Sequence, residues 1–139
     1  MKKVPFPEIP LEEFELRKKK AMKLMSENGV DGMLLFNNQN LTYFFGFRKT
    51  WLFQWLHAGL ITKEGQVGIV IPQIMDEVAR QTTWLDNENI KAWGGAPHWG
   101  LPKDPIEAVT GMIKKFGLGE KVIGAEIGGP AYSYMNVGL

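Results

Sequence analysis

The chain contains no cysteine, and only two of its 139 residues are histidine. Without cysteine there is no disulfide framework, no thiolate metal site and no thiol nucleophile. His57 and His98 lie far apart, so neither the H-x-x-x-H nor the H-E-x-x-H spacing of a zinc site occurs. We therefore expect no metal and no cofactor in this chain, and a location in the reducing cytoplasm.

An excess of charge of one sign is also lacking. Sixteen basic residues balance fifteen acidic ones and leave a net charge of +1. Such a balance provides no basic surface for nucleic acid or for an anionic membrane. No apolar run approaches the length that spans a bilayer, and the basic start MKK is not followed by the apolar run of a signal peptide. We expect neither nucleic acid nor a membrane as a partner.

Catalytic sequence motifs are equally scarce. Ser26 and Ser133 do not lie in a G-x-S-x-G elbow, and neither type of glycine-rich phosphate loop is present. The glycine pairs 94–95 and 128–129 lack the strand-to-helix context of such a loop and are typical of turns. We predict no catalytic residue in this chain.

The most prominent feature that is present is an aromatic segment, residues 40–57, with the sequence NLTYFFGFRKTWLFQWLH. Seven of the chain's sixteen aromatic residues lie in its last fifteen positions, interleaved with Arg48, Lys49, Gln54 and His57. Neither the period of a helix nor that of a strand fits the whole segment. Such a composition is typical of a binding wall or a subunit contact, and the alternative is a well-packed core element.

The order of predicted elements indicates an α/β fold. Helices are predicted over residues 11–28, 73–84 and 105–116, and strands over 33–36, 57–63, 66–71, 89–93 and 121–126. Between these elements we predict a polar turn over 37–40, a short helical turn over 43–46 and a hairpin turn at 64–65, after an extended arm over 1–10. This order predicts a mixed β-sheet flanked by helices, with parallel pairs where a helix crosses over.

Several positions carry a more specific expectation. The run Arg17–Lys20 is balanced by glutamates and is typical of a solvated helix face. Tyr43 is expected to anchor a turn in the core, and Gly46 to supply a backbone conformation that other residues avoid. The N-cap of the last helix is expected at Asp104. The buried set of the helix over 73–84 is expected to be Ile74, Val78, Ala79 and Leu85.

Four sequence blocks follow one another along the chain: Met25–Phe36, Asn40–Phe47, Asp76–Trp93 and Ile123–Glu126, the last after a helix that begins Pro105-Ile-Glu. In this order and spacing the blocks resemble the N-terminal domain of the creatinase/prolidase/aminopeptidase P family, the pita-bread metallohydrolases of peptidase family M24. The resemblance spans about residues 11–135. It implies one domain over residues 1–139 with the mixed-sheet fold of that family, which contains a ribonuclease H-like motif. Phe45 departs from the pattern, since the family often has Thr or Ser there.

The resemblance implies that catalysis belongs to a C-terminal domain absent from this chain. In the family that domain holds two divalent metals (Mn, Co or Zn in the expected parent enzyme) through two Asp, one His and two Glu, or works without metal in creatinase. The implied function is a non-catalytic, substrate-shaping and dimerisation domain of an Xaa-Pro aminopeptidase, a dipeptidase or a creatinase-like hydrolase. The implied substrate is a small peptide or small amide. The alternative is a free-standing dimerisation or binding module without hydrolase activity.

The resemblance also implies a role for part of the aromatic segment. Family members are commonly homodimers in which the segment after the tyrosine–glycine block helps to wall the partner subunit's active site. The implied substrate-binding residues in this chain are Phe47, Arg48, Trp51, Trp55 and His57. The two tryptophans would form apolar walls, and Arg48 or His57 would bind a substrate carboxylate, which the planar fork of arginine suits. The alternative for Arg48 is a solvated surface cation.

Overall fold

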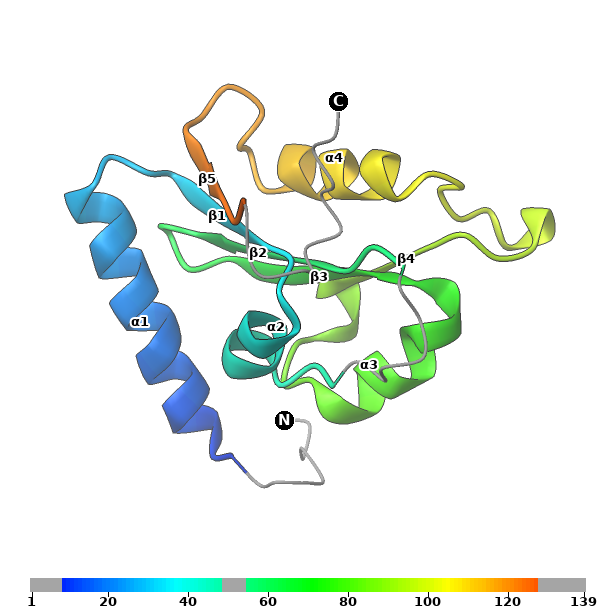
Figure 1. Ribbon diagram of the computed structural model, residues 1–139, viewed down its shortest axis with the longest axis horizontal. Coiled ribbons are helices and arrows are strands. Elements are labelled where there is room, and N and C mark those ends of the chain that lie inside the picture. Colours follow the sequence, from blue (N-terminus) through cyan, green and yellow to red (C-terminus); the bar gives the residue numbers. More distant parts are fainter. Residues whose placement is uncertain (1–8, 49–54, 128–139) are drawn as a thin grey trace.

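The chain folds around a five-stranded mixed sheet. A computed structural model describes residues 9–48 and 55–127, and its sheet has the order β4-β3-β2-β1-β5 (Figure 1). The strands are β1 (Gly32–Leu35), β2 (Ala58–Thr62), β3 (Val67–Pro72), β4 (Ile90–Trp93) and β5 (Ile123–Ala125). The pairs β1–β2 and β2–β3 are antiparallel, whereas β3–β4 and β1–β5 are parallel. The predicted mixed sheet and the hairpin between β2 and β3 are confirmed.

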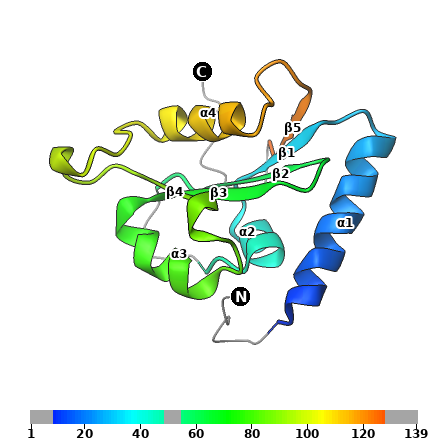
Figure 2. The same cartoon turned by 180° about the vertical axis from the view of Figure 1, so that it is seen from behind.

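Helices cover both faces of the sheet. They are α1 (Leu11–Glu27), α2 (Asn38–Phe45), α3 (Asp76–Thr82) and α4 (Pro105–Lys115), with short 3₁₀ turns over 73–75, 87–89 and 97–99. Figures 1 and 2 show α4 on one face of the sheet and α2 and α3 on the other, with α1 packed beside α2. Because both faces are covered, every residue of β2 and β3 is buried, and these strands read as almost continuous apolar runs.

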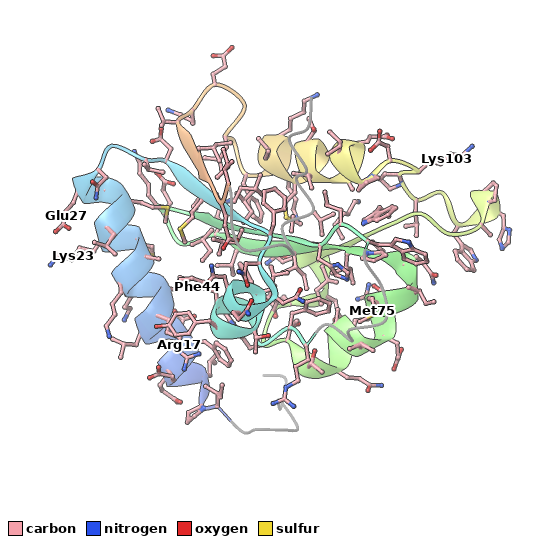
Figure 3. All side chains as sticks on the ribbon, in the orientation of Figure 1. Arg17, Lys23, Glu27, Phe44, Met75 and Lys103 are labelled. Carbon is pink, nitrogen blue, oxygen red and sulfur yellow. The ribbon has the colours of Figure 1, made fainter. Side chains whose placement is uncertain are left out.

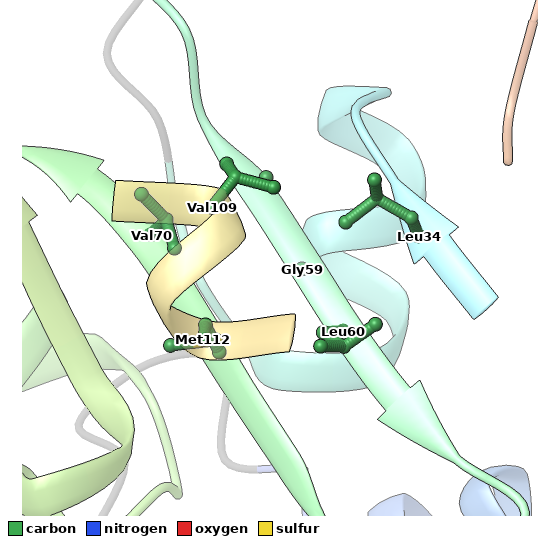
Figure 4. Close-up of a pocket in the computed structure, with 7 residues that line it drawn as sticks. Leu34, Gly59, Leu60, Val70, Val109 and Met112 are labelled. Carbon is green, nitrogen blue, oxygen red and sulfur yellow. The ribbon is translucent and has the colours of Figure 1, made fainter. Parts of the chain in front are cut away.

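Each face of the sheet has its own hydrophobic core. The core on the side of α1, α2 and α3 is built around Phe45, Phe47, Ile69 and Ile71, which are fully buried. The core under α4 is smaller, and Figure 4 shows Val109 and Met112 of α4 lying over Leu60 and Val70 of the sheet. The space that these side chains leave has no room for a water molecule, so α4 and the sheet are in tight contact.

Glycines in the strands allow the helices to approach this closely. A Cβ atom added at Gly68 would lie 2.8 Å from the sulfur of Met112 on α4. On the opposite face, a Cβ atom added at Gly59 would lie 2.1 Å from the Phe45 ring. Both separations are far below van der Waals contact. The close approach of α4 and α2 to the sheet therefore requires residues without a side chain at these two positions.

The starts of two predicted elements differ from the structure. The predicted polar turn over 37–40 is the start of α2, because the Asn37 side chain accepts a hydrogen bond from the backbone N–H of Gln39 at 2.8 Å and caps the helix. The helix expected over 73–84 begins as a 3₁₀ turn, which has fewer residues per turn than an α-helix. This shift buries Met75, which is 2% exposed, and leaves Ile74 51% exposed instead of buried.

The run Arg17–Lys20, expected to be a solvated helix face, is exposed at Lys19 and Lys20 but half-buried at Arg17 and Lys18. Arg17 on α1 extends toward α2 (Figure 3), and its guanidinium donates a hydrogen bond to the backbone carbonyl of Tyr43 at 2.8 Å. The same guanidinium carbon lies 4.2 Å from the centre of the Tyr43 ring. Tyr43 itself is 44% exposed, so it supports Arg17 from the surface and does not anchor the core as expected. A cation at the carboxyl end of α2 is also favoured by the helix dipole.

Candidate functional site

The aromatic segment leaves α2 through a glycine in the left-handed conformation. Gly46 has a φ of 71°, and its N–H closes the last turn of α2 by donating to the carbonyl of Thr42 at 3.0 Å. A Cβ atom added at Gly46 would lie 3.1 Å from the carbonyl oxygen of Thr82. The unusual backbone conformation expected at this glycine is confirmed, and it turns the following residues back toward the sheet.

Two of the five predicted site residues point into the protein. Phe47 is fully buried and His57 is 2% exposed, and their ring centroids lie 5.5 Å apart. The carbonyl of Phe47 accepts a hydrogen bond from the hydroxyl of Thr42 at 2.8 Å. The Nδ1 atom of His57 lies 2.6 Å from the carbonyl oxygen of Trp55, to which it donates. These contacts fix both ends of the predicted wall segment to the core.

The other predicted site residues lie nearer the surface or outside the described part of the chain. Arg48 is half-buried, and Trp55 is 46% exposed. Trp51 belongs to residues 49–54, which lie outside the described residues. Of the predicted wall residues that the structure describes, Trp55 therefore presents the largest exposed fraction.

Trp55 belongs to an open pocket that the sequence did not reveal. Its indole ring lies 6.5 Å from that of Trp93, centroid to centroid, at an interplanar angle of 62°. Together with Trp99 these rings line a pocket of about 480 Å³, which we call the tryptophan pocket. Its wall also includes Pro72, Gln73 and Ile74.

The topology of the sheet explains why these tryptophans meet. Strands β3 and β4 are parallel neighbours, and their register places Pro72 beside Trp93, so both strands end at the same edge. After β4 the chain turns at Gly94 and Gly95, whose φ angles are 77° and 84°, and returns Trp99 to this edge. The sequence predicts a turn after each of these strands. It does not predict that the two turns lie side by side, because this depends on the strand order.

The described residues hold no metal-binding constellation. Over 9–48 and 55–127, no group of three or more His, Cys, Asp or Glu side chains is arranged to bind a metal ion. In the ion pair Arg80–Asp76 on α3, hydrogen bonds to Asp76 raise the pKa of the guanidinium. Within the same ranges, no helix combines the length and apolarity needed to cross a bilayer.

The fold and the site define an α/β domain with an aromatic surface and, among its described residues, no group of three or more His, Cys, Asp or Glu side chains that could hold a metal ion. Residues 17–136 match the family model described as the Creatinase/Prolidase N-terminal domain. The chain therefore belongs to the family of creatinase/prolidase N-terminal domains, as its sequence blocks indicated. A search of curated proteins gave no match.

Solved structures with the same fold include parts of larger proteins. A dipeptidase from Pyrococcus horikoshii OT3 is 22% identical with a TM-score of 0.63, over 83% of this chain and 29% of that one. The dipeptidase PepE from Mycobacterium ulcerans is 19% identical with a TM-score of 0.65, over 89% of this chain and 31% of that one. The N-terminal domain of Xaa-Pro dipeptidase from Lactobacillus brevis is 15% identical with a TM-score of 0.62, over 79% of this chain and 75% of that one.

These likenesses show the fold. They also show how much of each similar chain this chain spans. This chain spans about three-tenths of the two dipeptidase chains, 29% and 31% respectively. By contrast, it matches three-quarters of the isolated N-terminal domain from Lactobacillus brevis.

Proposed function

We propose that this chain is the substrate-shaping and dimer-forming N-terminal domain of a hydrolase of the Xaa-Pro peptidase or creatinase kind. The main support is the family match over residues 17–136, together with a structural match that spans only 29% of the dipeptidase chain from Pyrococcus horikoshii. The names of the similar structures favour a small peptide as substrate of the parent enzyme. The parent reaction would be hydrolysis of an amide or amidine-type C–N bond in the cytoplasm.

The catalytic groups would lie in a C-terminal domain outside this chain. Residues 9–48 and 55–127 offer no group of three or more His, Cys, Asp or Glu side chains that could hold a metal ion. In this proposal the metals belong to the other domain. When bound there, two divalent ions such as Mn, Co or Zn would activate water and stabilise developing negative charge. This chain would contribute by binding and orienting the substrate and by excluding water from the active site.

The aromatic segment would make that contribution in a homodimer. Phe47 and His57 would hold the ends of the segment against the core, since both side chains are buried. Arg48 and Trp55, with Trp51, would face the active site of the partner subunit. An arginine there suits a substrate carboxylate, and exposed indole rings supply the large, rigid contact area common at protein interfaces.

Self-association of the purified chain tests this role. We expect light scattering to show a dimer, and Trp55→Ala to raise its dissociation constant by about tenfold or more, because interface tryptophans often dominate binding. Tyr43→Ala is the matched control, since Tyr43 is also an aromatic residue of similar exposure but lies on α2. A monodisperse monomer at high concentration, or equal effects of both substitutions, would count against the proposal. The free-standing binding module also allows a dimer, and the mass of the natural protein separates the two functions.

A further inference from the structure

The tryptophan pocket has the dimensions and position of a small-molecule site. It lies where the parallel strands β3 and β4 end, and its volume of about 480 Å³ falls within the range of ligand pockets. Trp55 and Trp99 are 46% and 48% exposed, so their rings border an accessible space and do not form a closed core. Large exposed apolar side chains gathered at one place on a soluble domain indicate an interaction site.

Backbone contacts hold two of the three rings in place. The indole N–H of Trp93 donates a hydrogen bond to the carbonyl of Leu56 at 3.0 Å, which fixes the ring at the end of β4. The ring of Trp99 lies directly on Gly95, since a Cβ atom added there would be 2.4 Å from one of its carbon atoms. The ring of His98 packs at an angle of 71° to that of Trp99, 5.5 Å away. These contacts position the rings of Trp93 and Trp99 within the described chain.

The chemistry of the described lining favours an unusual kind of cation. Indole faces attract positive charge through their quadrupole, and this attraction operates at exposed sites as well as at buried ones. None of the described lining residues carries a charge, and Gln73 is the polar side chain among them. A primary ammonium would lose water from its N–H donors here without meeting a carboxylate. A quaternary ammonium has no N–H donor, so it can enter such a pocket without that loss.

We propose that the tryptophan pocket, formed by Trp55, Trp93 and Trp99, binds a compact quaternary-ammonium group. The pocket is built by a single chain, so the proposal does not rest on the intersubunit role of the aromatic segment. A purely apolar ligand, or an apolar side chain of a partner, is the alternative occupant. Such an occupant would be stabilised by burial of its apolar surface alone, and a positive charge would not strengthen its binding.

Two ligands of the same shape distinguish the contribution of positive charge to binding from that of apolar burial. Choline and 3,3-dimethylbutan-1-ol differ in having a positively charged nitrogen or a neutral carbon at the branched centre. Each is titrated into the 139-residue chain while the N–H signals of the indole rings are followed by NMR. We expect choline to shift the pocket signals saturably and to bind at least about fivefold more tightly than the neutral alcohol.

Variants assign the binding to the pocket. Trp99→Leu should weaken choline binding by about three- to tenfold, the loss expected for one cation–π contact. Gly95→Ala is a second route, because the added Cβ displaces Trp99 without removing it. The control is Trp84→Phe, since Trp84 lies outside the pocket and stacks on Phe14 at 5.9 Å. Circular dichroism verifies the fold of each variant.

Three results would overturn the proposal. Equal affinity for choline and the neutral alcohol would show an apolar pocket without preference for charge. No saturable shift with choline would show that the pocket does not bind this group at all. An equal loss in Trp84→Phe and Trp99→Leu would place the binding elsewhere. Because Trp55 also belongs to the proposed intersubunit wall, the titration is performed at a concentration at which light scattering shows a monomer. The results then do not depend on dimerisation, so this proposal and the proposed function can fail separately.

Discussion

The carboxylate of Glu126 accepts a hydrogen bond from the backbone N–H of Phe36 at 2.8 Å, although ninety positions separate the two residues. The same oxygen accepts a second bond from the N–H of Asn37 at 2.8 Å, and the other oxygen accepts one from the side chain of Asn40 at 2.7 Å. The carboxylate thus lies at the start of α2, where the helix dipole favours negative charge. It connects the end of β5 to the helix that precedes the aromatic segment.

Replacement of Glu126 should destabilise the domain. Glu126→Ala removes the acceptor of three hydrogen bonds, and we expect the free energy of unfolding to fall by about 2–3 kcal/mol. Glu126→Gln keeps an acceptor but loses the charge, so a smaller loss of about 1 kcal/mol is expected. Urea unfolding followed by circular dichroism measures both. Glu120→Ala, at an exposed position, is the control, and equal stabilities of Glu120→Ala and Glu126→Ala would disprove the structural role.

Gly59 in β2 should not tolerate a side chain. Gly59→Ala would place its Cβ atom 2.1 Å from a ring carbon of Phe45 and 2.9 Å from a methyl of Leu41, so α2 would have to move. We expect a loss of about 2–3 kcal/mol in the free energy of unfolding, as for an overpacked core. Gly111→Ala is the opposite control, because Gly111 lies exposed in α4 with no atom within 4 Å of the added Cβ. That variant should gain about 0.5–1 kcal/mol, and a neutral Gly59→Ala would show that α2 is not held there.

Asp31 forms an ion pair that predicts a dependence of stability on pH. One of its oxygens lies 2.5 Å from the ammonium of Lys63, and the other accepts a hydrogen bond from the N–H of Val122 at 3.0 Å. The hydrogen bond from Lys63, followed by that from Val122, lowers the pKa of the carboxyl below its ordinary value of 3.8. The partner is affected in the opposite direction, since the Asp31 carboxylate raises the pKa of Lys63.

Because the Asp31 pKa is lower in the folded state, its ionisation stabilises the protein above pH 3.8 and ceases to do so as pH falls through the lower folded value. The difference in free energy of unfolding between the natural chain and Asp31→Asn should thus be largest near neutral pH. It should narrow as the pH falls below about 4. Denaturation at a series of pH values measures this, with Asp86→Asn at an exposed position as control. A difference that stays constant down to pH 2 would refute the assigned pair.

Metal ions should not bind tightly to this chain. The described residues lack a group of three or more metal-binding side chains, and the two histidines are separated, with His57 buried and His98 exposed. Calorimetric titration with Mn²⁺, Co²⁺ or Zn²⁺ should therefore give only weak heats that do not saturate at a defined stoichiometry. A tight one-to-one isotherm would mean that residues of this chain form a metal site.

Elements with local signals in the sequence could be predicted well. The cap of α4 is an example, because the Asp104 side chain accepts a hydrogen bond from the N–H of Ile106 at 2.7 Å, as a cap residue followed by proline suggests. The start of α2 could not be predicted in this way. Asn37 and Asn40 look like turn residues, and the carboxylate that supports their helix comes from Glu126, which is distant in sequence.

The candidate site could also be predicted only in part, because some of its features depend on residues that are distant in sequence. The aromatic content of the segment was evident, but the sequence could not show that Phe47 is buried while Trp55 is half-exposed. That separation depends on the left-handed turn at Gly46 and on the pairing of β2 with β3. The tryptophan pocket was missed because Trp99 reaches it only through the parallel pairing of β3 and β4 and the loop that follows.

The intact mass of the natural protein, measured from its source together with the sequence of its C-terminal peptides, tests most directly whether catalysis lies in a second domain. If it does, the mass will be about 40 kDa, because a domain of roughly 200–250 residues adds to the 15.7 kDa of this chain. The added part should then contain the two Asp, one His and two Glu that bind the metals. A mass of 15.7 kDa would contradict the proposed function and favour a free-standing binding module.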